Sequence, residues 1–124
     1  MSGALVGVVV GHGGMAAALV DAAEQITGIR GALVPVSNTG CDRNSLEARV
    51  VEAVGSHPAV VFVDMPSGSC LIAAMRHLSG REDVRVVTGV NLVMLLDFLF
   101  HRDRDVAEAA RQAAAAGAKG ILER

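Results

Sequence analysis

Short apolar runs alternate with longer stretches of helical periodicity along the chain. The apolar runs contain almost no polar positions, which is typical of strands buried on both faces. The runs predict strands at Leu5–Val10, Ala32–Val36, Val60–Val63 and Val84–Val87. The stretches between and after them predict helices at Met15–Thr27, from a cap at Asn44 or Ser45 to about Val54, from the end of the 65–69 loop to Gly80, at Leu92–Phe100 and at Val106–Ala116.

This alternation of strands and helices predicts βαβ units and therefore an α/β fold, a three-layer sandwich around a parallel sheet. The tail Gly120–Glu123 is a candidate for one more short strand. The length of 124 residues fits one core, so we expect residues 1–124 to form a single domain. Within the first helix, the apolar stripe expected to face the sheet is Met15, Leu19, Ala22, Ala23 and Ile26.

The composition excludes several classes of function. Aromatic residues make up 2% of the chain and the net charge is −2, so neither a stacking platform nor a basic surface is available for nucleic acid. Each apolar run is far shorter than the roughly 18 residues that a membrane span needs, and Met1-Ser2-Gly3 lacks the basic start of a secretory signal. The chain's two cysteines form neither a disulfide framework nor a CxxC pair. A cytoplasmic location is therefore expected.

The candidate chemistry lies where the predicted strands end, because ligands of open parallel sheets bind beyond the carboxyl ends of the strands. His12 follows the first strand, the 38–42 loop follows the second, Asp64 follows the third and the 88–91 segment follows the fourth. In a sheet of order 2-1-3-4 the first and third strands are neighbours, so His12 and Asp64 would meet. A carboxylate that accepts one imidazole N–H leaves the other ring nitrogen as an oriented nucleophile.

Two helices are expected to begin beside this pair. Gly13 and Gly14 open one helix, and Ser67, Gly68 and Ser69 open the other. The first turn of a helix offers unpaired N–H groups and a partial positive charge, which favour phosphate. The arrangement predicts phosphoryl transfer through a phosphohistidine, with no metal and no cofactor, since the chain lacks a P-loop to hold a nucleotide.

The remaining histidines and the first cysteine have structural interpretations. His57 precedes a proline at the amino end of the third strand, and His77 and His101 lie near helix C-termini, where a cation is favourable. Cys41 has no activating group beside it and is interpreted as a free thiol.

Three motifs together resemble a known family. They are the segments Val10-Gly11-His12-Gly13, Val63-Asp64-Met65-Pro66-Ser67-Gly68-Ser69 and Thr88-Gly89-Val90-Asn91-Leu92-Val93-Met94-Leu95. In order and spacing they resemble the enzyme IIA domain of the mannose-type phosphoenolpyruvate-dependent sugar phosphotransferase system, and the resemblance covers essentially the whole chain.

The resemblance implies a role for each matching residue. His12 would accept a phosphoryl group from the histidine-containing phosphocarrier protein and pass it to a separate IIB component, with Asp64 orienting it. Gly68 and Ser69 would form the loop beside the phosphohistidine, with Gly13 and Ser67 as further phosphate-binding candidates and Asn91 as a candidate site-lining residue. The family fold implies the order 2-1-3-4 and a homodimer that exchanges a C-terminal antiparallel edge strand. Contact with a membrane permease would occur only through partners.

The chain also departs from the family pattern. Ser67 stands where the family has a glycine, and Cys70 and Val93 stand where it has prolines. Two alternatives stay open: a regulatory, phosphorylation-sensing IIA-like module without a transport role, and a small tetrapyrrole metal chelatase, whose first strand also ends in a Gly-His-Gly-like turn. The sequence identifies neither the sugar nor the ring nitrogen of His12 that would be phosphorylated.

Overall fold

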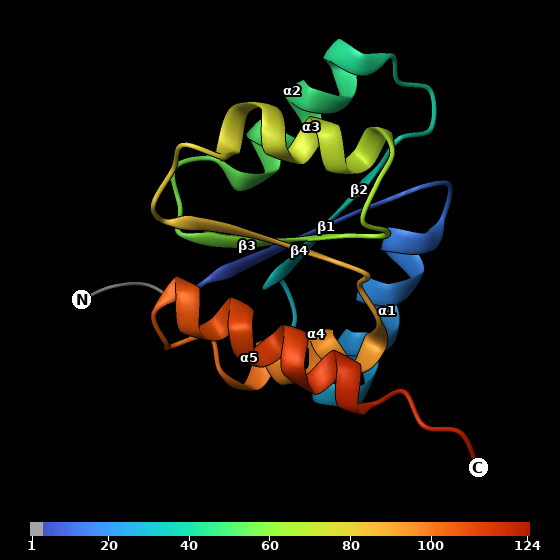
Figure 1. Cartoon of the computed structure of the whole chain (residues 1–124), viewed down its shortest axis with the longest axis vertical. Helices are drawn as coiled ribbons and strands as arrows, with labels where there is room; N and C mark the ends of the chain where they lie inside the picture. Colours follow the sequence, from blue (N-terminus) through green and yellow to red (C-terminus); the bar gives the residue numbers. More distant parts are fainter. Residues whose placement is uncertain (1–3) are drawn as a thin grey trace.

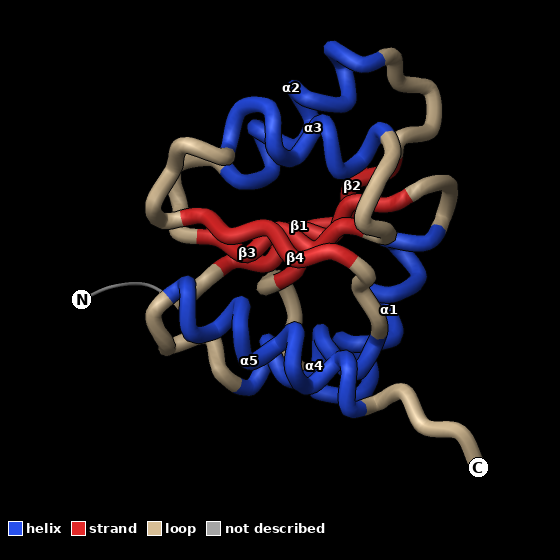
Figure 2. Tube along the Cα trace, viewed as in Figure 1, coloured by secondary structure: helices blue, strands red, loops and turns tan. Residues whose placement is uncertain are grey.

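The computed structural model describes residues 4–124. A parallel sheet of four strands lies between two helical layers, as Figures 1 and 2 show. The strands are β1 (Val6–Gly11), β2 (Leu33–Ser37), β3 (Ala59–Val63) and β4 (Val84–Thr88), in the order β2-β1-β3-β4. Both the three-layer α/β class and the strand order predicted above are confirmed.

The helices divide between the two faces of the sheet. The helices are α1 (Met15–Thr27), α2 (Arg43–Val54), α3 (Ser69–Leu78), α4 (Leu92–Phe100) and α5 (Val106–Lys119). Helices α2 and α3 cover one face, and α1, α4 and α5 cover the other (Figure 1). None of the helices within residues 4–124 is both long and apolar enough to cross a membrane.

The buried valines of the strands divide between the two faces because side chains alternate along a strand. Val8 and Val10 of β1 pack with α2 and α3, whereas Val9 packs with α1, α4 and α5. The largest buried side chains, Phe62 and Phe98, lie on the second face, which is the face covered by α1, α4 and α5. Their rings meet edge to face, with the ring centroids 5.2 Å apart. Both faces of the sheet are therefore buried beneath helices, as the continuous apolar runs predicted.

Gly7 explains how closely the second face is packed. A Cβ at this position would lie 2.6 Å from Leu33 Cδ2 and 2.8 Å from the ring of Phe98. These distances are shorter than real Cβ contacts, so any larger residue would force Leu33 and Phe98 to shift, and glycine lets β1 pass beneath Phe98 without that shift.

One local expectation is wrong and another is only partly right. The residue that caps α2 is Asp42, not Asn44 or Ser45. The Asp42 carboxylate accepts the Ser45 N–H at 2.8 Å, and the Ser45 hydroxyl oxygen accepts the Asp42 N–H at 2.9 Å. In helix α1, Ala23 is buried and Leu19 packs against the core, as expected. Met15 and Ile26 are exposed, however, and Ala16 and Val20 take the inward positions. Small alanines let the helix axis approach the sheet, and this close approach selects the alanine-bearing face.

The C-terminal tail does not form a strand within the single chain. Residues 121–124 lie outside helix and strand, and the tail projects away from the sheet in Figure 1. Strand exchange with a second copy therefore stays a prediction.

Candidate functional site

His12 and Asp64 meet where β1 and β3 end. Val10 pairs with Val63 across the two strands, so the residues that follow both strands emerge side by side. Asp64 Oδ2 lies 2.5 Å from His12 Nδ1 and also accepts the backbone N–H of His12 at 3.1 Å. One carboxylate oxygen thus holds both the ring and the main chain of the histidine.

The pair is exposed on one side only. The His12 side chain is 47% exposed, whereas that of Asp64 is 8% exposed. With Nδ1 directed at the carboxylate, the other ring nitrogen, Nε2, is the one available to an incoming group. Among residues 4–124, no side chain forms a hydrogen bond with Nε2. Such a ring, fixed through one nitrogen and open at the other, has the geometry of an oriented nucleophile.

Helices α1 and α3, which begin beside this pair, both lack a side-chain cap. Gly14 precedes α1 and Gly68 precedes α3, and neither can supply a capping oxygen from a side chain. Gly68 has φ +94°, a backbone conformation that residues other than glycine adopt only at a cost in free energy. The N–H of Met15, the first in α1, donates to the His12 carbonyl at 3.3 Å. The other N–H groups of the first turns have no side-chain cap and are the donors that the predicted phosphate site would use.

The loop after β2 supports the turn at His12 from the other side. Asn38 Oδ1 accepts the Gly13 N–H at 3.1 Å, and the Ser37 hydroxyl donates to the Gly13 carbonyl at 2.8 Å. The N–H of Gly13, a predicted phosphate-binding group, is thus already bound to Asn38. The strand-end rule had placed Asn38 at this edge without giving it a role.

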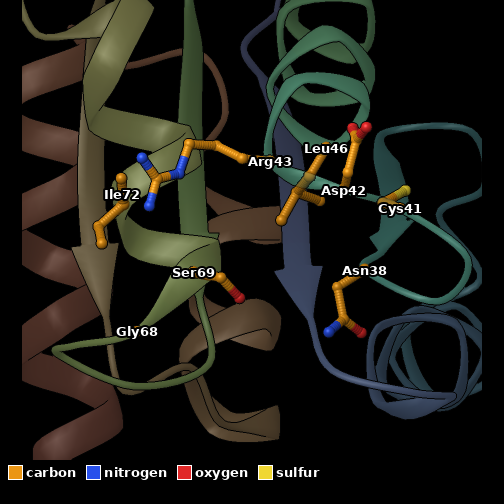
Figure 3. Close-up of a pocket in the computed structure, with 8 residues that line it drawn as sticks. All are labelled: Asn38, Cys41, Asp42, Arg43, Leu46, Gly68, Ser69 and Ile72. Atoms are coloured by element: carbon orange, nitrogen blue, oxygen red, sulfur yellow. The ribbon is translucent and has the colours of Figure 1, made fainter.

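A pocket of about 340 Å³ lies between the starts of α2 and α3, as Figure 3 shows. Ser69 and Asn38 line it from opposite sides, and Arg43 reaches across it toward Ile72 (Figure 3). Ser69, as the first residue of α3, has an exposed side chain, and so does Ser67. The loop hydroxyls are thus accessible, which a role in phosphate binding requires.

Cys70 is the residue that sequence reasoning missed. It was noted only as a departure from the family proline, yet its Sγ lies 3.7 Å from His12 Nδ1 and its side chain is fully buried. Burial, and secondly the charge of Asp64, raise the pKa of the Cys70 thiol to about 11, so the thiol is protonated at neutral pH. Its position after Ser69 was the available signal, but only the rotation of α3 determines that it faces the histidine.

Asn91 has an identifiable local role. Its side chain accepts from the Met94 N–H at 2.9 Å, which caps α4, and donates to the Gly117 carbonyl at 3.1 Å, which joins α4 to α5. No contact with His12 or Asp64 is recorded for Asn91 within the described residues, and its role as a site-lining residue stays a prediction.

The other histidines lie away from the pair. His77 Nε2 is 2.8 Å from Glu47 Oε1 in the layer of α2 and α3. His101 follows α4 and contacts Asp97 of the same helix, with Nδ1 3.3 Å from Oδ1. His57 lies just before β3, at the opposite edge of the sheet from Asp64.

Comparison with known proteins connects this geometry to one family. The family model described as "PTS system fructose IIA component" (EIIA-man) matches residues 7–115, which include all of the site described above. No curated protein matches the sequence significantly.

Solved structures share the fold. The phosphotransferase system component EIIA from Streptococcus agalactiae is 19% identical, with a TM-score of 0.88 and 96% of each chain covered. The mannose/sorbose-specific IIA subunit from Enterococcus faecalis is 22% identical, with a TM-score of 0.84, covering 100% of this chain and 96% of that one. The family match extends over most of the sequence, and the chain therefore belongs to the EIIA-man family of phosphotransferase system IIA components.

Proposed function

We propose that this protein is a phosphocarrier that accepts a phosphoryl group on Nε2 of His12 from the histidine-containing phosphocarrier protein and passes it to a separate IIB component. The observation that carries the proposal is the fixed ring: Asp64 binds Nδ1 at 2.5 Å and leaves Nε2 at the exposed side. Membership in the IIA family favours this chemistry over the tetrapyrrole chelatase.

The geometry supports an in-line transfer between two histidines. The lone pair of Nε2 attacks phosphorus, the bond from phosphorus to the donor nitrogen breaks, and its electron pair returns to the donor ring. The positive charge that develops on the His12 ring is stabilised by Asp64 through the Nδ1 proton. Passing the group to a IIB component reverses these steps, so neither redox chemistry nor a net proton transfer is required.

The passing phosphoryl group carries negative charge on its three outer oxygens, which need donors. The uncapped first turns of α1 and α3 supply backbone N–H groups, and Ser69 supplies a hydroxyl beside them. These donors are fixed before the reaction, and preorganised donors are the most effective way to stabilise transferred charge.

A homodimer formed by strand exchange is part of the same proposal. The outer strand β4 has half-buried residues from Val86 to Thr88 and lies at an open edge of the sheet. In the C-terminal tail, 76% of Ile121 and 68% of Leu122 are exposed. Pairing this tail with the β4 edge of a second copy would cover the exposed tail side chains and the open strand edge. Light scattering that compares the full chain with a chain ending at Gly120 tests this dimer. We expect the truncated chain to be monomeric.

The decisive experiment is phosphorylation by enzyme I, the phosphocarrier protein and phosphoenolpyruvate, followed by mass spectrometry. We expect one acid-labile phosphoryl group on the wild type, none on His12→Ala and unchanged labelling of His57→Ala, the matched control at the other edge of the sheet. Full acid-labile labelling of His12→Ala contradicts the proposal. Labelling of His12 that no IIB component can remove supports the regulatory alternative instead.

A further inference from the structure

Three potential metal ligands of different chemical types meet at the closed side of the His12 ring. His12 Nδ1, a carboxylate oxygen of Asp64 and Cys70 Sγ all lie within 4.8 Å of one another. They come from the turn after β1, from the end of β3 and from the first turn of α3. Phosphoryl transfer at Nε2 uses the first two and has no use for the thiol.

One atom of this cluster lacks the partner that its burial requires. Asp64 Oδ1 is buried and forms no hydrogen bond with any of residues 4–124, although the side chain is only 8% exposed. Buried polar atoms are nearly always paired, so an unpaired carboxylate oxygen calls for an explanation. Oxygen, imidazole nitrogen and sulfur together form a donor set typical of zinc, whereas magnesium and calcium take oxygen ligands.

The spacing of one donor pair, the imidazole nitrogen and the thiol sulfur, already fits a tetrahedral ion. Bonds of about 2.0 Å to nitrogen and about 2.3 Å to sulfur place the two ligand atoms about 3.5 Å apart. The observed distance between His12 Nδ1 and Cys70 Sγ is 3.7 Å. The nitrogen and the carboxylate oxygen, now 2.5 Å apart, must separate by about 0.8 Å to span such an ion.

We propose that His12, Asp64 and Cys70 form a binding site for Zn²⁺, in which the ion replaces the proton shared by His12 and Asp64. Three protein ligands leave a fourth coordination position for water. The two negative ligands, carboxylate and thiolate, balance the charge of the ion.

Metal binding changes the protonation of Cys70 and of His12. The Cys70 thiol loses its proton to solvent, since a coordinating thiol is deprotonated outright. His12 stays neutral, and coordination through Nδ1 forces its ring proton onto Nε2. A protonated Nε2 has no lone pair to attack phosphorus, so bound zinc blocks phosphoryl transfer. This inhibition rests on the proposed function, whereas the binding does not.

Binding is tested with Co²⁺ and Zn²⁺ alone, added to the full chain. We expect a cobalt–thiolate absorption band in the wild type that Zn²⁺ displaces. The band should be retained in Cys41→Ser and lost in both Cys70→Ser and Cys70→Ala. Zinc affinity should fall by at least about tenfold in the Cys70 variants, because even an outer hydrogen-bond partner of a metal ligand contributes about 10–100-fold. Circular dichroism establishes that each variant is folded.

A missing thiolate band in the wild type, or the same band in folded Cys70 variants, overturns the zinc site. Inhibition is measured separately, as the ratio of His12 labelling with and without Zn²⁺. This ratio should be far below one in the wild type and in Cys41→Ser, and close to one in Cys70→Ala. If zinc inhibits Cys70→Ala as strongly as the wild type, the proposal that zinc bound at this site blocks phosphoryl transfer is overturned. Binding by a wild type that is never labelled, even without zinc, would refute the proposed function and leave the site standing.

Discussion

The helices of this protein begin in two different ways. The starts of α2, α4 and α5 are closed by the side chains of Asp42, Asn91 and Asp105, each of which accepts a backbone N–H. The starts of α1 and α3 follow Gly14 and Gly68 and have no such cap. The uncapped helices are the two that flank His12.

The difference teaches how the fold separates stability from function. A cap satisfies the first N–H groups and stabilises a helix by about 1 kcal/mol. Omitting a cap gives up that stabilisation and leaves the donors available for a ligand. The chain has capped α2, α4 and α5 and left uncapped the two helices whose starts flank His12.

The largest effect is expected from Asp64→Asn, which damages the pair between the two uncapped helices. The amide NH₂ would donate to Nδ1 and hold the proton on Nε2, so the ring is kept in the wrong tautomer. A comparable change in a Ser-His-Asp triad costs about 10⁴-fold, and we expect the initial rate of His12 labelling to fall by about 10²–10⁴-fold. Asp97→Asn, beside His101, is the matched control and should label at the wild-type rate.

A smaller effect is expected when the open start of α1 is given a charge. A Cβ at Gly14 would meet no atom within 4 Å, and φ is −89°, so Gly14→Asp is tolerated sterically. The carboxylate would repel the phosphoryl group by about 1.4 kcal/mol, which slows labelling about tenfold. The unfolding free energy should not fall, because negative charge is favourable at a helix start. Gly14→Asn caps the same helix start without a charge, so it should slow labelling less than Gly14→Asp. Equal slowing by the two variants would assign the effect to the cap and contradict the role of the charge.

The reverse pattern is expected when a capped start is opened. Asp105 accepts the N–H of Glu108 at the start of α5, and Asp105→Ala should lower the unfolding free energy by about 1 kcal/mol. Labelling per folded molecule should stay at the wild-type level, because α5 begins away from His12. Denaturant unfolding gives the first quantity and mass spectrometry the second. A loss of labelling without a loss of stability would erase the distinction between the two kinds of helix start.

The smallest effect is a pH dependence at the cap of α2. Hydrogen bonds from the Ser45 N–H and then from its hydroxyl hold the pKa of Asp42 below its ordinary value of 3.8. A lowered folded-state pKa gives stabilisation that is complete above the unfolded value and is lost as the pH falls through the folded value. The stability difference between the wild type and Asp42→Ala should therefore be constant near neutral pH and shrink below 3.8. A difference that grows in acid would show that the carboxylate is not the cap.

The sequence predicted the features that follow from strand topology. Parallel strands end at one edge, so residues 52 positions apart, His12 and Asp64, could be placed together once the strand order was assumed. Features that depend on helix rotation could not be predicted. Met15 and Ala16 are adjacent and both apolar, and only the packing of α1 against the sheet shows that Ala16 is the buried one. Cys70 meets His12 for the same reason, because a small rotation of α3 would turn its thiol away.

The two outer strands give the sheet different capacities to grow. Strand β2 contains Pro35, which has no N–H to offer a further strand, whereas β4 contains no proline. Addition of strands is therefore favoured at one side only. A sheet that accepts strands at one edge only would be closed once a second copy paired there, so this asymmetry disfavours the open-ended strand addition by which a valine-rich protein would form fibrils.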